Sequence, residues 1–186
     1  MTAYHTIVAD PPWSYGNKRW ASITHNGTGP RIEKDMPYLT MSLGDIQALP
    51  VRSLAAKDCR LFLWTTNRHL PFAFDVMAAW GFKYTLALIW RKTGNPSPFA
   101  GSGVASIQHE LLLVGKRGSP PVLSQLPSSV LDVPAKVFGH SAKPEVFQDY
   151  IEAVSPGPYL ELFARRQRSG WDVWGNEVDS DVELVA

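Results

Sequence analysis

Four consecutive residues near the start of the chain have types and a spacing that could do chemistry: Asp10, Pro11, Pro12 and Trp13. They follow the apolar residues 7–9, which predict a buried strand. In an open α/β sheet, a carboxylate at the carboxyl end of a strand faces the crevice where such sheets bind ligands. Proline fixes φ and has no N–H, so the pair predicts a rigid turn whose carbonyl groups are free acceptors. The indole that follows offers a flat face for stacking.

Acceptors beside a stacking face suit an exocyclic amino group on a flat nucleobase. The lone pair of such an amine is delocalised into the ring. Two acceptors that hold its hydrogens favour a more tetrahedral nitrogen, with the lone pair directed at an electrophile. The structural alternative is a strand closed by turn residues, with Asp10 as a cap and Trp13 in the core. These four residues alone leave both interpretations open.

The sequence lacks the common motifs of nucleotide-binding and metal-binding sites. Residues 101–106 lack the third glycine of a dinucleotide fingerprint, and no P-loop pattern occurs. The five histidines show no ligand spacing, so we predict no metal site. Cys59 is the single cysteine, which excludes a disulfide within the chain. It begins an apolar run and is predicted to be a small core residue rather than a nucleophile.

The elements that must position these groups are predicted from hydrophobic runs. Helical spacing predicts one helix over 69–81, closed by Gly81, and one over 141–154, with Ser141 as N-cap and Pro144 in the first turn. Strands that alternate with helices predict an α/β fold with a mostly parallel sheet. Five runs are strand-length and nearly continuous, which is typical of strands covered on both faces: 6–10, 60–64, 85–90, 110–115 and 159–163.

Three long segments, 14–38, 93–107 and 116–137, have no assigned element. Long loops in a compact domain are usually functional or disordered. All three follow the carboxyl ends of expected strands, so we expect them at the ligand-binding edge of the sheet.

Charge divides the 186 residues into a domain, 1–176, and an acidic tail, 177–186. The domain holds 18 basic and 13 acidic side chains, whereas the tail holds four acidic and no basic ones. A mildly basic body permits a nucleic-acid partner, and ordinary surface charge with a solvated tail is the alternative. No apolar run approaches the roughly 20 residues of a membrane span, and no signal peptide is evident. We therefore predict a cytoplasmic protein with no membrane partner.

A series of short motifs identifies a family. The DPPW sequence at 10–13 resembles the catalytic motif of the amino-methyltransferases, which methylate adenine N(6) or cytosine N(4) with S-adenosylmethionine. In its Trp form it is similar to the family typified by the catalytic subunit of the eukaryotic messenger-RNA adenosine N(6)-methyltransferase. The series runs in order over nearly the whole chain: PYLTM (37–41), LFLWTTN (61–67), IWRK (89–92), HELLLVGKRG (109–118), HSAKP (140–144), ELFAR (161–165) and WGNE (174–177).

The resemblance implies a Rossmann-like methyltransferase fold in permuted order, with the catalytic strand first and the cofactor strand near the C-terminus. It places Lys143 at the carboxylate of S-adenosylmethionine, Glu161 and Arg165 around the ribose, and Asn176 at the cofactor after the last strand. The alternatives are a solvated lysine at a helix start and an asparagine in a turn.

The chain departs from the family pattern at three of the expected cofactor contacts. Gln167 and Arg168 stand where a His-Asn pair is usual, and Glu177 stands where glutamine is common. These residues remain cofactor-binding candidates on the adenine side.

The resemblance therefore predicts an adenine N(6)-methyltransferase that acts on nucleic acid. Asp10 and the two proline carbonyls would orient the amine, and Trp13, with Tyr15, would stack on the base. Lys18, Arg19 and Trp20 combine basic and aromatic side chains suited to nucleic acid, with solvated loop charges as the alternative.

DNA is favoured over RNA because the chain is short and stands alone. Two alternatives stay open: the same reaction on RNA, and a catalytically silent partner that binds nucleic acid. A homodimer is one assembly that the sequence permits.

Overall fold

The computed structural model describes residues 3–14, 40–94, 104–134 and 143–184. Within them, seven strands form one sheet in the order β5-β3-β4-β2-β1-β6-β7. The strands are β1 (Tyr4–Ala9), β2 (Ala55–Thr65), β3 (Lys83–Thr93), β4 (His109–Arg117), β5 (Val130–Pro134), β6 (Tyr159–Leu162) and β7 (Trp171–Trp174). The helices are α2 (Leu43–Ala48), α3 (Val51–Leu54), α4 (Leu70–Ala79) and α5 (Val146–Val154).

The predicted α/β class and mostly parallel sheet are confirmed. Only β4 among the described strands runs against its neighbours, β2 and β3, and the other pairs are parallel. The reversal corrects one expectation, because the segment after β4 leaves the sheet at the edge opposite the carboxyl ends of β1, β2 and β3. The same segment also contains a strand, β5, where none was predicted.

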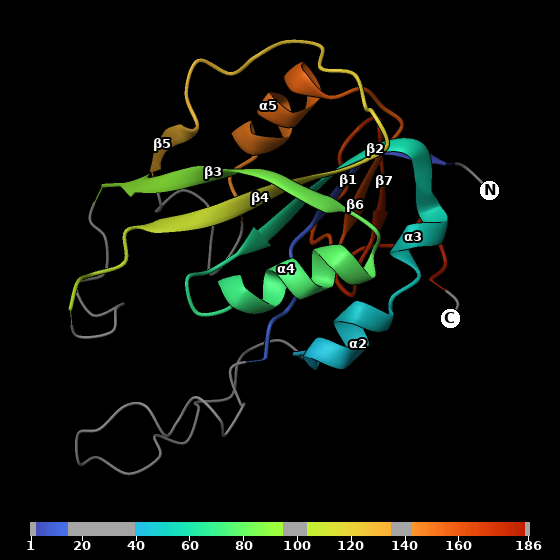
Figure 1. Cartoon of the computed structure of the whole chain (residues 1–186), viewed down its shortest axis with the longest axis horizontal. Coiled ribbons are helices and arrows are strands. Elements are labelled where there is room, and N and C mark those ends of the chain that lie inside the picture. The colour runs from blue at the N-terminus through green and yellow to red at the C-terminus, as the bar shows by residue number, and fades with distance from the viewer. Residues whose placement is uncertain (1–2, 15–39, 95–103, 135–142, 185–186) are drawn as a thin grey trace.

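Helices cover both faces of the sheet, with α5 on one side and α2 and α4 on the other (Figure 1). Successive residues of β2 alternate between the two cores: Leu61 and Leu63 face α4, and Phe62 and Trp64 face α5. The strands are therefore apolar on both faces, as the continuous runs predict. Cys59 is fully buried in the α4-side core, as predicted.

Both predicted helices form, but their boundaries and one exposed residue differ from the prediction. The chain leaves α4 through Gly81, whose φ of 85° favours glycine. Phe74, one of the apolar residues that give the helical spacing, is 39% exposed. Pro144 precedes the N-cap of α5, Glu145, instead of lying inside the first turn. The predicted cap, Ser141, lies outside the described residues.

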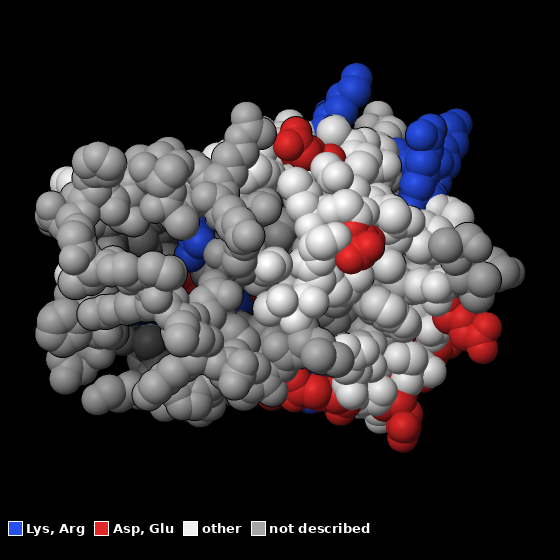
Figure 2. All heavy atoms as spheres, turned by 90° about the horizontal axis from the view of Figure 1, so that it is seen from below, with Lys and Arg blue, Asp and Glu red and all other residues white. Residues whose placement is uncertain are grey.

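The acidic tail packs against the sheet as far as it is described. The backbone N–H of Asp181 donates to the carbonyl of Val173 over 2.9 Å, and its carboxylate accepts from the N–H of Val173 over 3.0 Å. Val182 and Leu184 pack against the α4-side core, so this segment is attached to the domain rather than solvated. Figure 2 shows the molecule from below the view of Figure 1. Described Lys and Arg side chains gather at the upper right, and Asp and Glu side chains lie along the lower edge and singly near the centre and top.

Candidate active site

The topology creates a crevice at the carboxyl ends of β1 and β6. The chain leaves β1 toward β2 on one side and returns through α5 to β6 on the other side of β1. The two strands are parallel and in register, with Ala9 opposite Leu162. Ligands of open α/β sheets bind where the strand order reverses in this way. Asp10 follows β1 at this edge, as predicted.

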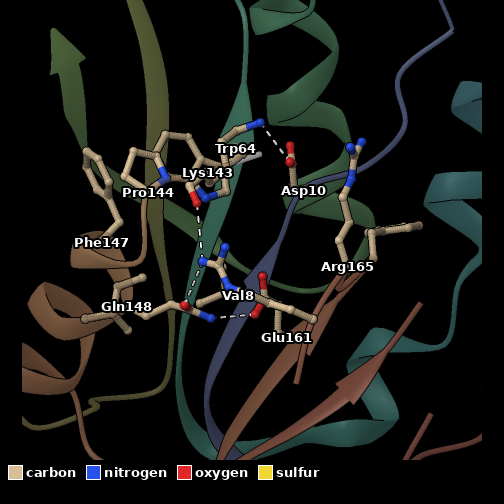
Figure 3. Close-up of a pocket in the computed structure, with 12 residues that line it drawn as sticks. Val8, Asp10, Trp64, Lys143, Pro144, Phe147, Gln148, Glu161 and Arg165 are labelled. Atoms are coloured by element: carbon tan, nitrogen blue, oxygen red, sulfur yellow. Dashed lines mark hydrogen bonds and ion pairs between the residues drawn. The ribbon is translucent and has the colours of Figure 1, made fainter. Parts of the chain in front are cut away.

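A cavity of about 500 Å³, counting its open mouth, lies at this point and faces α5 (Figure 3). It brings together Asp10, Lys143, Glu161 and Arg165, four of the predicted site residues that lie far apart in sequence. The remaining lining residues are Val8, Trp64, Pro144, Phe147, Gln148, Ile151, Phe163 and Arg166.

At one end of the cavity, Lys143 joins two carboxylates. Its Nζ lies 2.7 Å from Asp10 Oδ2 and 3.3 Å from Glu110 Oε2. Glu110, at the start of β4, also forms an ion pair with Lys92 at the end of β3. The reversed direction of β4 is what brings Glu110 to this edge, so a chain of alternating charges runs from Lys92 to Asp10.

Burial and the neighbouring charges together set the pKa values of Asp10, Glu110 and Lys143. It raises the pKa of Asp10, an effect that Lys143 partly offsets and the nearby charge of Glu110 reinforces. Burial also acts on Glu110, but Lys143 and Lys92 outweigh it and lower the pKa of that carboxyl. The ammonium of Lys143 is disfavoured by burial, yet Asp10 and Glu110 together raise its pKa. Lys143 is therefore held charged between two carboxylates.

Glu161 in β6 lies on the opposite side of the cavity. Its Oε2 accepts a hydrogen bond of 2.6 Å from the amide of Gln148 in α5. Desolvation raises the pKa of this carboxyl from its ordinary 4.5 to about 7, although Arg166 and Arg168 pull it down. A buried carboxyl with a strongly raised pKa in a cleft is typical of a functional site.

The backbone after β6 turns sharply at the cavity wall. Phe163 has a φ of 64°, a left-handed conformation that is uncommon outside glycine. Arg165 follows and projects toward the side of Asp10 (Figure 3). Its Nε lies 3.6 Å from Glu177 Oε1, which brings two predicted cofactor residues together. Asn176 lies beside them in an exposed turn and does not line the cavity.

Gln167 and Arg168, the other predicted adenine-side contacts, do not line the cavity. The amide of Gln167 donates to the carbonyl of Asp179 over 3.4 Å. Arg168 pairs with Asp149 and Glu152, which ties the loop after β6 to α5. In this structure Arg168 joins two elements of the fold.

The turn after β1 also differs from its prediction. The N–H of Trp13 donates to the carbonyl of Pro11 over 2.8 Å, and the N–H of Met41 donates to that of Pro12 over 2.9 Å. Both carbonyls thus have a partner, although each keeps a second lone pair. Trp13 itself is only 7% exposed, and its ring stacks on His69 at 5.5 Å between centroids. This corrects the expectation of free acceptors and an open stacking face.

The four predicted substrate contacts, Tyr15, Lys18, Arg19 and Trp20, lie outside the described residues and stay predictions. Sequence analysis missed Glu110, Gln148 and Arg166. Glu110 stands inside one of the recognised motifs, HELLLVG, where an acid in front of a buried strand was the available signal. In the described parts of the chain, no group of three or more His, Cys, Asp or Glu could hold a metal ion, and no helix has the length and apolarity to cross a membrane.

The model of the MT-A70 family matches residues 4–177. The chain belongs to the MT-A70 family. This confirms the resemblance drawn from the motif series, and with it the Rossmann-like methyltransferase fold.

Three relatives illustrate the family. The type II methyltransferase M.MunI of Mycoplasma sp is 34% identical over 97% of this chain and 81% of its own length. The human N(6)-adenine-specific methyltransferase METTL4 is 32% identical over 94% of this chain, which spans 37% of METTL4. The N6-methyladenosine RNA methyltransferase MTA1 of Cryphonectria parasitica is 29% identical over 94% of this chain, which spans 52% of MTA1.

Proposed function

We propose that this protein transfers a methyl group from S-adenosylmethionine to the exocyclic N(6) amino group of adenine in nucleic acid, with DNA as the favoured substrate. The observation that carries the proposal is the placement of Asp10 on one cavity that also contains Lys143, Glu161 and Arg165. Relatives named as adenine-specific and as RNA methyltransferases support the choice of base and of nucleic acid.

The cavity residues fit S-adenosylmethionine. Glu161 offers a carboxylate whose second oxygen, Oε1, accepts no hydrogen bond from the described chain and can accept ribose hydroxyls. Phe163 and Phe147 supply apolar walls, and Arg165 and Lys143 supply positive charge for an amino-acid carboxylate. When bound there, S-adenosylmethionine would supply an electrophilic methyl group on its sulfonium.

Asp10 is the residue placed to orient the amine. Its carboxylate is fixed by the N–H donors of Lys143 and stands at the end of β1, beside the cavity. By accepting an amine hydrogen it would localise the nitrogen lone pair, and the second lone pairs of the Pro11 and Pro12 carbonyls would add acceptors. The gain comes from alignment and electrostatics rather than from a covalent intermediate. A base in a duplex would first have to be flipped out, at a cost of a few kcal/mol.

The preference for DNA is supported by similarity to a type II methyltransferase that is matched over most of both chains. The same reaction on RNA is the second candidate, favoured by the similarity to MTA1. A silent nucleic-acid-binding partner fits less well, because the DPPW motif is intact and Asp10 faces the cavity.

Tritiated methyl transfer to matched DNA and RNA oligonucleotides, single- and double-stranded, followed by nucleoside analysis, tests the proposal. We expect N(6)-methyladenine in DNA. Label in N(6)-methyladenosine from RNA alone would move the substrate to RNA. Cofactor binding with no transfer to any member of the panel would indicate a silent partner.

A further inference from the structure

We propose that Gln148, oriented by Arg166, is a positioning residue that holds one oxygen of the Glu161 carboxylate and turns the other toward the cofactor cavity. The expected effect on cofactor affinity rests on the proposed function. The hydrogen bonds that orient Gln148 and Glu161 are observed in the structure.

Three side chains, from α5, β6 and the loop after β6, form a continuous line of hydrogen bonds along the cavity wall (Figure 3). Arg166 Nη2 donates to Gln148 Oε1 over 3.2 Å, and Gln148 Nε2 donates to Glu161 Oε2 over 2.6 Å. Gln148 is only 5% exposed although it lies on a helix. A buried amide must satisfy both its donor and its acceptor ends, and here each end has one defined partner.

The chemistry of the partners fixes which way the amide points. A guanidinium only donates, so the end of Gln148 that faces Arg166 must be the carbonyl oxygen. The NH₂ group must then face Glu161, where it donates to the carboxylate. Arg166 therefore determines the orientation of Gln148, and Gln148 determines the rotation of the carboxylate.

Arg166 is itself anchored to the segment that carries Lys143. Its Nη2 also donates to the carbonyl of Lys143 over 3.3 Å, and its Nε lies 3.3 Å from Glu145 Oε1. The line of contacts thus connects the backbone at Lys143, which lies at the Asp10 end of the cavity, with Glu161 on the other side. The guanidinium of Arg166 therefore helps to place both the backbone at Lys143 and the side chain of Glu161.

The donor from Gln148 matters because Glu161 titrates near neutral pH. Burial raises its pKa to about 7 and the charge of Asp10 adds to this, whereas Arg166, Arg168 and the Gln148 hydrogen bond lower it. The ionised carboxylate accepts two ribose hydroxyl hydrogens better than the protonated acid does. Gln148 therefore keeps more of Glu161 in the form that binds, at the pH where the protein would work.

Gln148→Met tests the proposal, because it keeps the length of the side chain and removes the donor. Gln125→Met is the matched control, since Gln125 is exposed and outside the cavity. The first measurement is the ¹³C carboxyl titration of Glu161 in the ligand-free protein, assigned by the signal lost in Glu161→Gln. We expect the midpoint to move to higher pH in Gln148→Met and to stay in place in the control.

The second measurement is calorimetric affinity for S-adenosylmethionine between about pH 6 and about pH 9. Loss of a hydrogen bond to a charged group predicts affinity about tenfold weaker at neutral pH in Gln148→Met, recovering at alkaline pH as Glu161 ionises. A purely structural role would weaken binding equally at every pH. If Gln148→Met does not fold, Arg166→Lys keeps the positive charge but releases the amide, and we expect the same upward shift.

An unchanged Glu161 midpoint in the folded variant overturns the proposal, and so does an unchanged affinity for S-adenosylmethionine at neutral pH. A parent protein that shows no binding of S-adenosylmethionine would refute the proposed function. The ligand-free titration would still decide whether Gln148 acts on Glu161.

Discussion

The ammonium group of Lys143 lies 2.7 Å from the carboxylate of Asp10. The family resemblance places this lysine at the carboxylate of S-adenosylmethionine, yet in the structure it holds the residue proposed to orient the amine. Glu110, 3.3 Å from the same Nζ, offers Lys143 a second carboxylate. Lys143 can therefore remain neutralised by Glu110 when Asp10 turns its oxygens to a substrate amine.

The first prediction concerns Asp10. Asp10→Asn keeps the shape of the side chain but weakens its acceptor and adds a donor, so methyl transfer should fall by at least about 100-fold. Steady-state transfer with saturating cofactor is the measurement. Cofactor affinity is measured separately by calorimetry because Asp10 also lines the cavity. A variant folded like the parent, with activity within about threefold, would exclude Asp10 as the orienting residue.

The second prediction concerns pH. Transfer that needs ionised Asp10 should decline as the pH falls through the pKa of Asp10, which burial raises and the charge of Glu110 raises further. Glu110→Gln removes that charge, so the pKa of Asp10 should drop and the acid limb of the pH–rate profile should move to lower pH. Asp132→Asn is the control, since it removes an exposed carboxylate that pairs with Arg91 outside the cavity. An acid limb that stays in place or moves upward in Glu110→Gln contradicts the coupling.

The third prediction tests whether Trp13 contributes to the stability of the core. The indole Nε1 donates to the carbonyl of Trp64 over 3.2 Å, and the ring packs on His69. Trp13→Phe should lose about 1 kcal/mol of unfolding free energy with the hydrogen bond. Trp13→Ala should lose about 3–5 kcal/mol, because it leaves a cavity in the core. Urea denaturation measures both, and a loss below about 1 kcal/mol for the alanine variant would show that the ring contributes little to the core.

The hydrophobic pattern predicted five of the strands because each carries a nearly continuous apolar run. β5 escaped prediction because it is an edge strand with one buried residue, Leu131. β7 has four residues between two glycines, so its apolar run is short. β6 has four residues too, but its run continues through Phe163 and Ala164. The reversed direction of β4 could not be predicted, since a strand covered on both faces has the same apolar sequence whichever way it runs. The order of the family motifs along the chain, rather than the hydrophobic pattern, identified the permuted fold.

In the site, too, some residues could be predicted from the sequence and others could not. Asp10 could be named in advance because it ends a recognisable strand, and Glu161 because it matches a family motif. Gln148 could not, because a single glutamine on an amphipathic helix looks like a solvent-facing residue. Gln148 is buried because its amide hydrogen-bonds to Glu161 on the next strand and to Arg166 in the loop that follows. Such contacts depend on how α5 lies on β6, which local sequence does not specify.

The last prediction concerns the cost of Glu161 to stability. Its pKa rises from 4.5 to about 7 on folding, so the folded state binds this proton more tightly than the unfolded chain does. At pH below about 4.5 both states are protonated and the group has no effect on the free energy of unfolding. As the pH rises through the window from about 4.5 to about 7, the unfolded chain ionises first, and stability falls by up to about 3 kcal/mol.

Glu161→Gln removes this titration. The variant should match the parent near pH 4 and exceed its unfolding free energy above about pH 7, while its affinity for S-adenosylmethionine falls. Urea denaturation at a series of pH values is the measurement, with Glu183→Gln as a control at an exposed glutamate. Parallel pH profiles for parent and Glu161→Gln would show that Glu161 is ionised at its ordinary pH. A gain in stability together with a loss of binding would show that the buried carboxylate is retained for the cofactor and not for the fold.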